Sequence, residues 1–277
     1  MRRRFFVEQF AGNRAVMEGE AAHHLARVLR AQPGQLYELS DGERVRLARI
    51  ETVKRERVEF SLTEELPAHE SKIRITLLLS IVKFDAFEWA LEKATELGVH
   101  TIVPLAAARS EKALLVAAPK RAERWRRILL EASQQSRRVR LPALARLTKS
   151  EEAFSSHNDA EPLRIILSER ASAPSLRTIL EKGAGWKPAL QNGDVKSPLQ
   201  NGDVPTESGY MPSPLQTRGQ VTTAVLAIGP EGGWAEAEAQ AAQRSGFHEA
   251  SLGRLILRTE TAVIAALASL NYALEAD

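Results

Sequence analysis

Two segments near the C-terminus limit the fold of this chain most, because each joins a strand pattern to a helix pattern through a glycine turn. In the first, the apolar run at 223–228 is followed by the turn GPEGGW at 229–234 and a helical pattern at 236–245. In the second, LGRLILRTETA at 252–262 leads into an apolar helix over 261–274. Glycine has no Cβ and tolerates positive φ, so such turns let the backbone approach a ligand closely. The pattern predicts an α/β unit in which the two glycine turns form the walls of one small-molecule site.

The chemistry of the GPEGGW turn argues against a phosphate ligand. The turn lacks the Gly-Lys-Ser/Thr end of a P-loop and the GxGxxG spacing of a dinucleotide fingerprint. It also carries Glu231 where a phosphate needs donors or cations. A neutral or cationic ligand therefore suits the turn better. The alternative is that the glycines serve only the steric needs of a strand-to-helix turn.

The second segment carries more than a helix start needs. Thr259 is placed to cap the following helix, but a cap does not explain the neighbouring Arg258 and Glu260. At these residues the chain resembles the SPOUT superfamily of methyltransferases and, within it, the ribosomal RNA small subunit methyltransferase E family. Further blocks in the family's order extend the resemblance over nearly the whole chain: MRRRFFVE (1–8), HHLARVLRAQPGQLYELSDGE (23–43), KFDAFEWALEKATELGV (83–99), IVPLAAARS (102–110), EASQQSRRVRLP (131–142) and LSER (167–170). One departure is Ala235, where the family usually has a Ser or Thr that caps the next helix. The missing cap should destabilise the start of the helix at 236–245 by about 1 kcal/mol.

The resemblance implies a fold, an activity and a site. The fold is an α/β SPOUT domain with a C-terminal trefoil knot, preceded by a small PUA-like β-barrel. The activity is S-adenosylmethionine-dependent methylation of the N3 atom of a uridine in small-subunit (16S) ribosomal RNA, by a cytoplasmic homodimer. The cofactor would lie across three loops and contact Leu167, Ser168, Gly229, Glu231, Gly232, Gly233, Leu252, Gly253, Leu257, Arg258, Thr259, Thr261 and Ala262. For Leu257, packing in the ordinary core is the alternative.

Methylation of uridine N3 needs assistance because that nitrogen carries a proton at neutral pH. Arg258, at a helix start beside the cofactor loop, is the candidate to stabilise charge on a flanking carbonyl oxygen. Glu260 and Glu88 are both candidates to take the proton or orient the base, and the sequence does not choose between them. Alternatively, Glu260 only favours the positive N-terminus of the helix. Two rival functions stay open: a non-catalytic RNA-binding factor, and an enzyme that binds a nucleotide in the glycine turn.

Composition excludes several kinds of site. The chain has no cysteine, which excludes disulfides, thiolate-bound zinc and a cysteine nucleophile and fits a reducing cytoplasm. Methylation of pyrimidine carbon 5 commonly uses such a nucleophile, whereas methylation of a ring nitrogen does not. The six histidines show no metal-ligand spacing, so no metal is predicted. No apolar run approaches the roughly 18 residues of a membrane helix.

Basic residues are locally concentrated, although the formal net charge is only +3. Between 120 and 146 there are nine Lys and Arg against two acids, which predicts a phosphate-contacting stripe. A solvated helix face is the alternative. The residues expected to contact RNA are Arg2, Arg3, Arg4, Arg27 and Arg30 in the barrel, and Lys83, Arg109, Arg137 and Arg138 beyond it.

Two domains are predicted, at 1–70 and 73–277. The first alternates short β runs with turns, and the second alternates apolar strands with helices, which favours a mostly parallel sheet. The expected elements of particular interest are strands at 73–82, 99–105, 163–167 and 223–228, and helices at 23–31, at 121–136 and after a cap at Asp85. The stretch 183–220 contains LQNGDV twice and few apolar residues, so it is predicted to be a disordered insertion.

Overall fold

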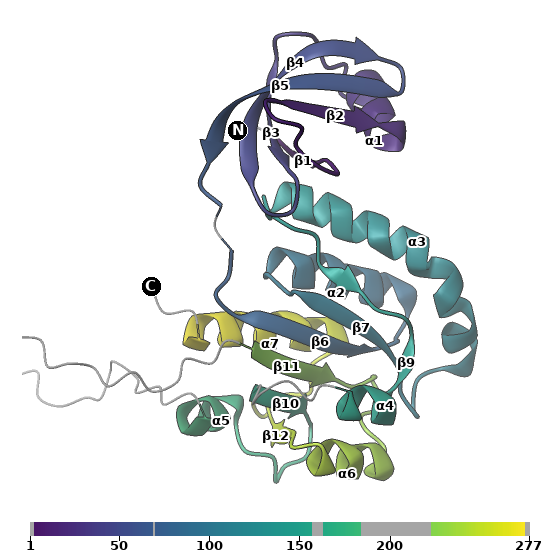
Figure 1. Ribbon diagram of the computed structural model, residues 1–277. Helices are drawn as coiled ribbons and strands as arrows, with labels where there is room; N and C mark the ends of the chain where they lie inside the picture. The colour runs from purple at the N-terminus through teal and green to yellow at the C-terminus, as the bar shows by residue number, and fades with distance from the viewer. Residues whose placement is uncertain (1–2, 69, 157–162, 184–222, 275–277) are drawn as a thin grey trace, which may run out of the picture.

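The chain builds two sheets, one from each end of the sequence, and each sheet has its own hydrophobic core (Figure 1). The computed structural model describes residues 3–68, 70–156, 163–183 and 223–274. The predicted insertion at 183–220 lies almost wholly outside the described residues, so its disorder stays a prediction.

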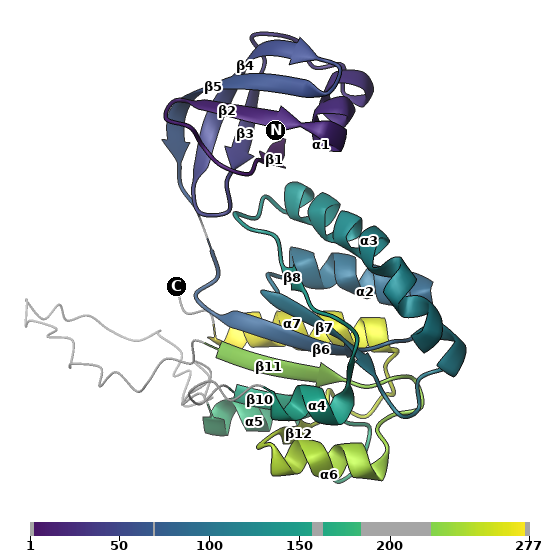
Figure 2. The same ribbon diagram turned by 45° about the vertical axis from the view of Figure 1, so that its right-hand side comes forward.

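The N-terminal sheet is a curled half-barrel of five strands in the order β1-β3-β4-β5-β2 (Figure 2). Its strands pair antiparallel, except that β1 runs parallel to β3. Side chains alternate between core and solvent, as Ala15 and Met17 show on β2. The strands are β1 (Arg4–Phe6), β2 (Arg14–Glu18), β3 (Leu36–Ser40), β4 (Val45–Lys54) and β5 (Arg57–Leu66).

A short helical segment closes one side of the half-barrel. It consists of α1 (Gly19–His23) and a wider turn, η1 (His24–Val28), with Ala22 and Leu25 buried in the half-barrel core. The helix predicted at 23–31 therefore begins and ends earlier than expected. Arg30 has a left-handed φ of +50°, which is incompatible with continuing the helix.

The C-terminal sheet runs in the order β12-β10-β11-β6-β7-β8, and β9 also pairs with β7. All its paired strands are parallel, which confirms the predicted type of sheet. Its central strands are continuous apolar runs because both faces are covered. The strands are β6 (Arg74–Ser80), β7 (Thr101–Ala106), β8 (Ala143–Leu144), β9 (Thr148–Lys149), β10 (Leu163–Leu167), β11 (Thr223–Ile228) and β12 (His248–Ala250).

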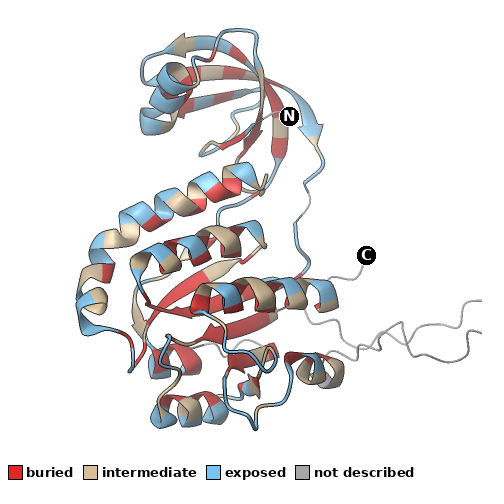
Figure 3. Cartoon of the chain, turned by 180° about the vertical axis from the view of Figure 1, so that it is seen from behind, coloured by how far each residue is buried: buried red, intermediate tan, exposed pale blue. Residues whose placement is uncertain are grey.

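Helices cover both faces of this sheet, and their buried sides turn toward it (Figure 3). One core packs the sheet against α2 (Phe84–Glu96), α3 (Lys112–Gln135), α5 (Leu176–Gly183) and α7 (Thr259–Leu274). A second core packs the opposite face against α4 (Ser150–Ser155) and α6 (Glu236–Arg244). The three-layer α/β fold agrees with the predicted fold class, whereas the trefoil knot stays a prediction.

Two helix starts differ from expectation. Helix α2 begins at Phe84 after an N-cap at Lys83, so Asp85 is not the cap. Asp85 lies instead in the first turn, where a carboxylate is favourable beside the helix N-terminus. Helix α3 begins at Lys112 rather than 121 and contains Pro119. Proline removes a backbone hydrogen bond inside a helix, so the sequence pattern favoured a later start.

A buried ion cluster joins the half-barrel to the C-terminal sheet domain. Glu38 accepts hydrogen bonds from Arg4, at 3.0 and 3.2 Å, and from Arg137. Arg4 also donates to the backbone oxygen of Arg137, and the Ser40 hydroxyl donates to that of Val139. The Arg4 and Glu38 side chains are only 8% and 7% exposed, so these contacts set how the two domains meet.

Candidate functional site

A cavity of about 930 Å³ opens at the carboxyl ends of β10, β11 and β12. Its walls include residues 166–170 at and after the end of β10, residues 228–234 at and after the end of β11, and residues 251–257 after β12. Ligands commonly bind at this edge in open α/β sheets, because the loops that follow parallel strands gather there. The structure therefore brings together the three loops that the sequence singled out.

The GPEGGW turn is held in place by its own backbone and by its tryptophan. The Gly233 N–H donates to the Pro230 oxygen at 2.8 Å, and Gly233 adopts a φ of +69°, which glycine tolerates. The Trp234 indole N–H donates to the Leu167 oxygen at 2.8 Å, which ties this turn to the loop after β10. A Cβ on Gly229 would lie 3.1 Å from the Trp234 ring. Any larger residue at 229 would therefore press against this aromatic ring, which would have to shift by a few tenths of an ångström.

The start of α7 closes the cavity from a third side. The Thr259 hydroxyl donates to the Gly229 oxygen at 3.2 Å, so it joins the two glycine segments directly. The prediction that Thr259 caps α7 is wrong, because the helix begins at Thr259 itself. The Arg258 backbone oxygen accepts the Ala262 N–H at 2.9 Å, which makes Arg258 the residue that precedes the helix.

The N-cap of helix α6 is Ala235, which has no acceptor side chain, as the sequence indicated. Glu238 compensates in part: its buried carboxylate accepts the Ala235 N–H at 3.0 Å and the Ala108 N–H at 2.9 Å. The second bond connects α6 to the loop after β7. Glu238 therefore stabilises the cavity wall from outside, a role that the sequence analysis missed although Glu238 stands at the third position of a capping box.

Most of the predicted cofactor contacts line the cavity. They are Leu167, Ser168, Gly229, Glu231, Gly232, Gly233, Leu252, Gly253, Leu257, Thr259 and Ala262. Leu257 also packs against the core, as the alternative for that residue expected, and its contact with a cofactor stays a prediction. Arg258 and Thr261 are exposed and are not part of the wall, although Arg258 stands between two residues that are.

The two candidate bases are placed very differently. Glu260 lies in the first turn of α7, half-buried, two residues after Arg258. Glu88 lies on α2, outside the cavity wall, where its buried carboxylate accepts hydrogen bonds from Arg121 at 3.1 Å and Arg124 at 2.7 Å. The structure therefore does not bring Glu88 to the cavity.

Many wall residues were not predicted as cofactor contacts, among them Arg109, Arg170 and Ile179. Arg109 donates to the Gly232 oxygen at 2.7 Å and so steadies the glycine turn. Arg170 forms an ion pair with Glu236 of α6. Ile179 reaches the cavity from α5. Arg170 stands in the LSER block and could have been singled out, whereas nothing in the sequence placed α5 beside the cavity.

The predicted RNA-binding residues fall into two groups. Arg3, Arg27, Arg30, Lys83 and Arg109 are exposed. The others make internal bonds: Arg4 and Arg137 hold Glu38, and Arg138 donates to the backbone oxygens of Thr95, at 2.8 Å, and Arg140. Arg2 lies outside the described residues.

Most cations of the basic segment 120–146 are neutralised by acids, all of them from outside the segment except Glu123. Its cations pair with Glu88, Glu123, Glu20, Glu38, Glu70 and Glu152. Much of this segment is therefore engaged in ion pairs between elements rather than forming an uninterrupted stripe.

Neither a metal cluster nor a membrane helix is found within the described ranges. These residues contain no group of three or more His, Asp or Glu side chains that could hold a metal ion. No helix among them is long and apolar enough to cross a membrane.

Comparison with known families matches both parts of the chain. The RNA methyltransferase domain family matches residues 69–192 and 200–271, and the RNA methyltransferase PUA domain family matches residues 18–63. The first match alone covers more than half of the chain.

Individual relatives and solved structures agree with the family match. The ribosomal RNA small subunit methyltransferase E of Synechocystis is 30% identical over 91% of this chain and 71% of its own length. The Aquifex aeolicus enzyme of that name is 28% identical over 94% and 95%. The Neisseria gonorrhoeae ribosomal RNA small subunit methyltransferase E, solved with S-adenosylmethionine, aligns with a TM-score of 0.75 and 29% identity over 98% of each chain. A putative methyltransferase of Legionella pneumophila, solved with the same cofactor, aligns with a TM-score of 0.75 and 27% identity over 99% and 98%. This chain therefore belongs to the ribosomal RNA small subunit methyltransferase E family.

Proposed function

We propose that this protein transfers a methyl group from S-adenosylmethionine to the N3 atom of a uridine in small-subunit ribosomal RNA. One observation carries the proposal: the three predicted loops meet around one cavity and are cross-bonded there, through Trp234 to Leu167 and through Thr259 to Gly229. The relatives named above supply the substrate class and the cofactor. The same proposal locates the protein in the cytoplasm, where ribosomal RNA is found.

The cavity wall suits a cationic cofactor of this size. Glycines at 229, 232 and 233 expose backbone groups, and Glu231 adds a carboxylate where a sulfonium, unlike a phosphate, is attracted. Leu252 and Leu257 offer apolar surface for an adenine ring. We assign the cofactor to these residues together with Leu167, Ser168, Gly253, Thr259 and Ala262. The bound sulfonium supplies an electrophilic methyl group.

The remaining chemistry falls to the start of α7. Uridine N3 becomes nucleophilic only as its proton leaves, and negative charge then spreads onto the flanking carbonyl oxygens. The exposed Arg258 guanidinium, beside the cavity, is our candidate to stabilise that charge. Glu260 is our candidate to accept the proton or orient the base, since Glu88 is held by two arginines on another helix.

Calorimetry and a methylation assay test this proposal. We expect S-adenosylmethionine to bind and NAD and ATP not to bind. Arg258→Ala should abolish methyl transfer and leave cofactor affinity within about twofold, because Arg258 is not part of the cavity wall. Arg244→Ala, at an exposed position on α6, is the matched control and should keep full activity. Absence of cofactor binding would favour a bare RNA-binding factor, and retained turnover in Arg258→Ala would remove Arg258 from the mechanism.

We propose residues 1–70 as the RNA-binding domain and residues 73–277 as the catalytic domain. The exposed cations Arg3, Arg27 and Arg30 on the first, with Lys83 and Arg109 on the second, are available for phosphate contacts. Arg4 and Arg137 support RNA binding through the contact between the domains that they make with Glu38.

We also propose a homodimer. Leu255 and Ile256 are 82% and 78% exposed in the loop before α7, and Tyr272 on α7 is 81% exposed. Exposure of large apolar side chains, as at the neighbouring positions 255 and 256, marks association surfaces. Analytical ultracentrifugation should show a dimer at micromolar concentration, and Leu255→Asp should shift it toward monomer. A monomeric wild-type protein under those conditions would refute this assembly.

A further inference from the structure

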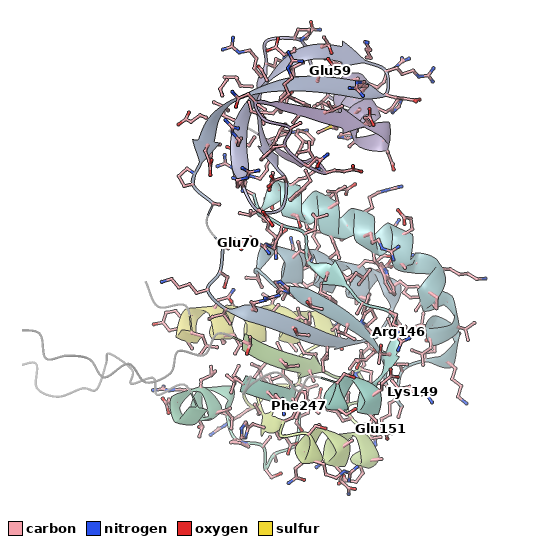
Figure 4. The ribbon with its side chains drawn as sticks, in the orientation of Figure 1. Glu59, Glu70, Arg146, Lys149, Glu151 and Phe247 are labelled. Atoms are coloured by element: carbon pink, nitrogen blue, oxygen red, sulfur yellow. The ribbon has the colours of Figure 1, made fainter. Side chains whose placement is uncertain are left out.

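A second, smaller pocket lies where the two domains meet. We call it the junction pocket. Its volume is about 330 Å³, within the range of small-ligand pockets. It is formed by the linker and first residues of β6, by His100 before β7, and by residues 136–140 after α3. Glu70, on the linker, marks its position between the half-barrel and the C-terminal sheet (Figure 4).

The junction pocket is strongly basic. Its wall carries five basic side chains, Lys72, Arg74, Arg137, Arg138 and Arg140, and one acid, Glu70. Glu70 pairs with Arg140 at 2.7 Å, and Arg137 is paired with Glu38. Two guanidinium groups, those of Arg74 and Arg138, form no ion pair with a carboxylate anywhere in the described part of the chain. The pocket therefore holds an excess of positive charge.

The bonding of these two arginines shows that each retains donors for a ligand. Arg74 is exposed and its Nη2 lies 2.9 Å from the Nε2 of His100. Arg138 uses Nη1 for the Thr95 oxygen and Nε for the Arg140 oxygen. A guanidinium carries five N–H donors in a planar fork that matches phosphate oxygens, so several donors remain.

The same cations act on His100, which is also in the pocket wall. Burial, followed by repulsion from Arg74, Arg140 and Arg138, lowers the pKa of His100. Its Nδ1 lies 3.0 Å from the Thr101 hydroxyl, which positions the ring. A group with negative charge placed in the pocket would offset that repulsion, so His100 is a built-in reporter of anion binding.

We propose that the junction pocket binds a phosphate group and that, during methylation, this group belongs to the backbone of the substrate RNA. The assignment to RNA rests on the proposed function. The pocket lies at the amino ends of β6 and β7, whereas the large cavity lies at the carboxyl ends of the same sheet. A seven-residue strand such as β6 spans about 23 Å, so the bound phosphate belongs to a nucleotide well removed from the target uridine. The pocket acts as a second anchor that fixes the register of the RNA.

Two measurements on the full-length protein test this proposal. The first follows the ring signals of His100 by NMR while inorganic phosphate is added. The second measures the affinity for a transcript of the small-subunit ribosomal RNA as a function of salt concentration. Arg74→Gln removes an exposed cation, Arg74→Lys keeps it, and Arg177→Gln removes an exposed cation from α5 as the charge-matched control.

We expect phosphate to raise the pKa of His100 in the wild-type protein and to do so more weakly in Arg74→Gln. Loss of one phosphate contact should reduce the slope of log affinity against log salt concentration by about 0.7–0.9 in Arg74→Gln. The slope should stay at its wild-type value in Arg74→Lys and Arg177→Gln.

The outcomes separate the pocket from the proposed function. If Arg74→Gln has the wild-type salt slope, and phosphate shifts the pKa of His100 in this variant as much as in the wild-type protein, the proposal that the pocket binds phosphate is wrong. A phosphate response at His100 without any change of slope would assign the pocket to free phosphate and overturn its assignment to RNA. Calorimetry should show unchanged S-adenosylmethionine binding in the same variants. If the wild-type protein does not bind S-adenosylmethionine, the methyltransferase proposal is refuted. Phosphate binding in the pocket is then still decided by the His100 titration.

Discussion

Gly229→Ala should damage the cofactor cavity through the tryptophan that packs on it. A Cβ at this position would meet three atoms of the Trp234 indole at 3.1, 3.2 and 3.3 Å, whereas carbon atoms prefer separations of about 3.5–4.0 Å. The ring must therefore move by a few tenths of an ångström. Two contacts resist that movement: the hydrogen bond to the Leu167 oxygen and the edge-on contact with Phe154, whose ring centroid lies 5.6 Å away.

The cost follows from what the ring would lose. The hydrogen bond contributes about 0.5–1.5 kcal/mol and the aromatic pair a similar amount, so we expect a loss of about 1–3 kcal/mol in the free energy of unfolding. Cofactor affinity should fall as well, because Leu167 and Gly229 both line the cavity. Urea unfolding measures the first effect and calorimetry the second.

A double-mutant cycle with Trp234→Phe isolates the cause. The phenyl ring lacks the indole nitrogen and the fused-ring carbons that the new Cβ would meet, so Gly229→Ala should cost much less in the Trp234→Phe background. The reasoning is refuted if Gly229→Ala leaves stability within about 0.5 kcal/mol of wild type, or if the two substitutions are simply additive.

Three further substitutions test other parts of the structure. Glu38→Gln should lower the free energy of unfolding by about 3 kcal/mol, because it leaves the buried Arg4 cation without its partner; chemical denaturation measures this, and a loss below 1 kcal/mol would contradict it. Thr259→Val removes the hydroxyl that donates to Gly229 and should cost about 1 kcal/mol together with weaker cofactor binding by calorimetry; unchanged binding would exclude this bond from the site. Because the pKa of His100 is lowered from 6.5, the unfolded chain takes up a proton that the folded chain refuses, and stability should fall as the pH drops below about 6.5. His100→Gln should flatten this part of a thermal-unfolding pH profile, and an equally steep profile would argue against it.

The strands of the C-terminal sheet could be predicted closely, and the reason is local. The runs at 163–167 and 223–228 coincide with β10 and β11, because a parallel strand buried on both faces must be apolar throughout. Helix starts were less predictable. Asp85 and Thr259 both have the chemistry of a cap, but the first lies inside its helix and the second bonds a glycine thirty residues away.

The roles of the charged residues could not be obtained in the same way. Glu88 and Glu260 were equivalent in sequence, and only the packing of α2 against α3 shows that Glu88 is held by two arginines. Arg4, Arg137 and Arg138 looked like other exposed cations, yet they bond internally. Each of these assignments depends on which groups the fold brings within bonding distance.

Sequence alone determined the four central strands of the parallel sheet, the glycine turns and the family, because these are written in neighbouring residues: apolar runs, residues without a Cβ, and short blocks in the family's order. Tertiary structure alone decided how the three loops are bonded to one another around the cavity, that Glu38 locks two domains together, and that a basic pocket lies between them. Those features join residues as far as 133 positions apart, and no local pattern records which distant partner a side chain will meet.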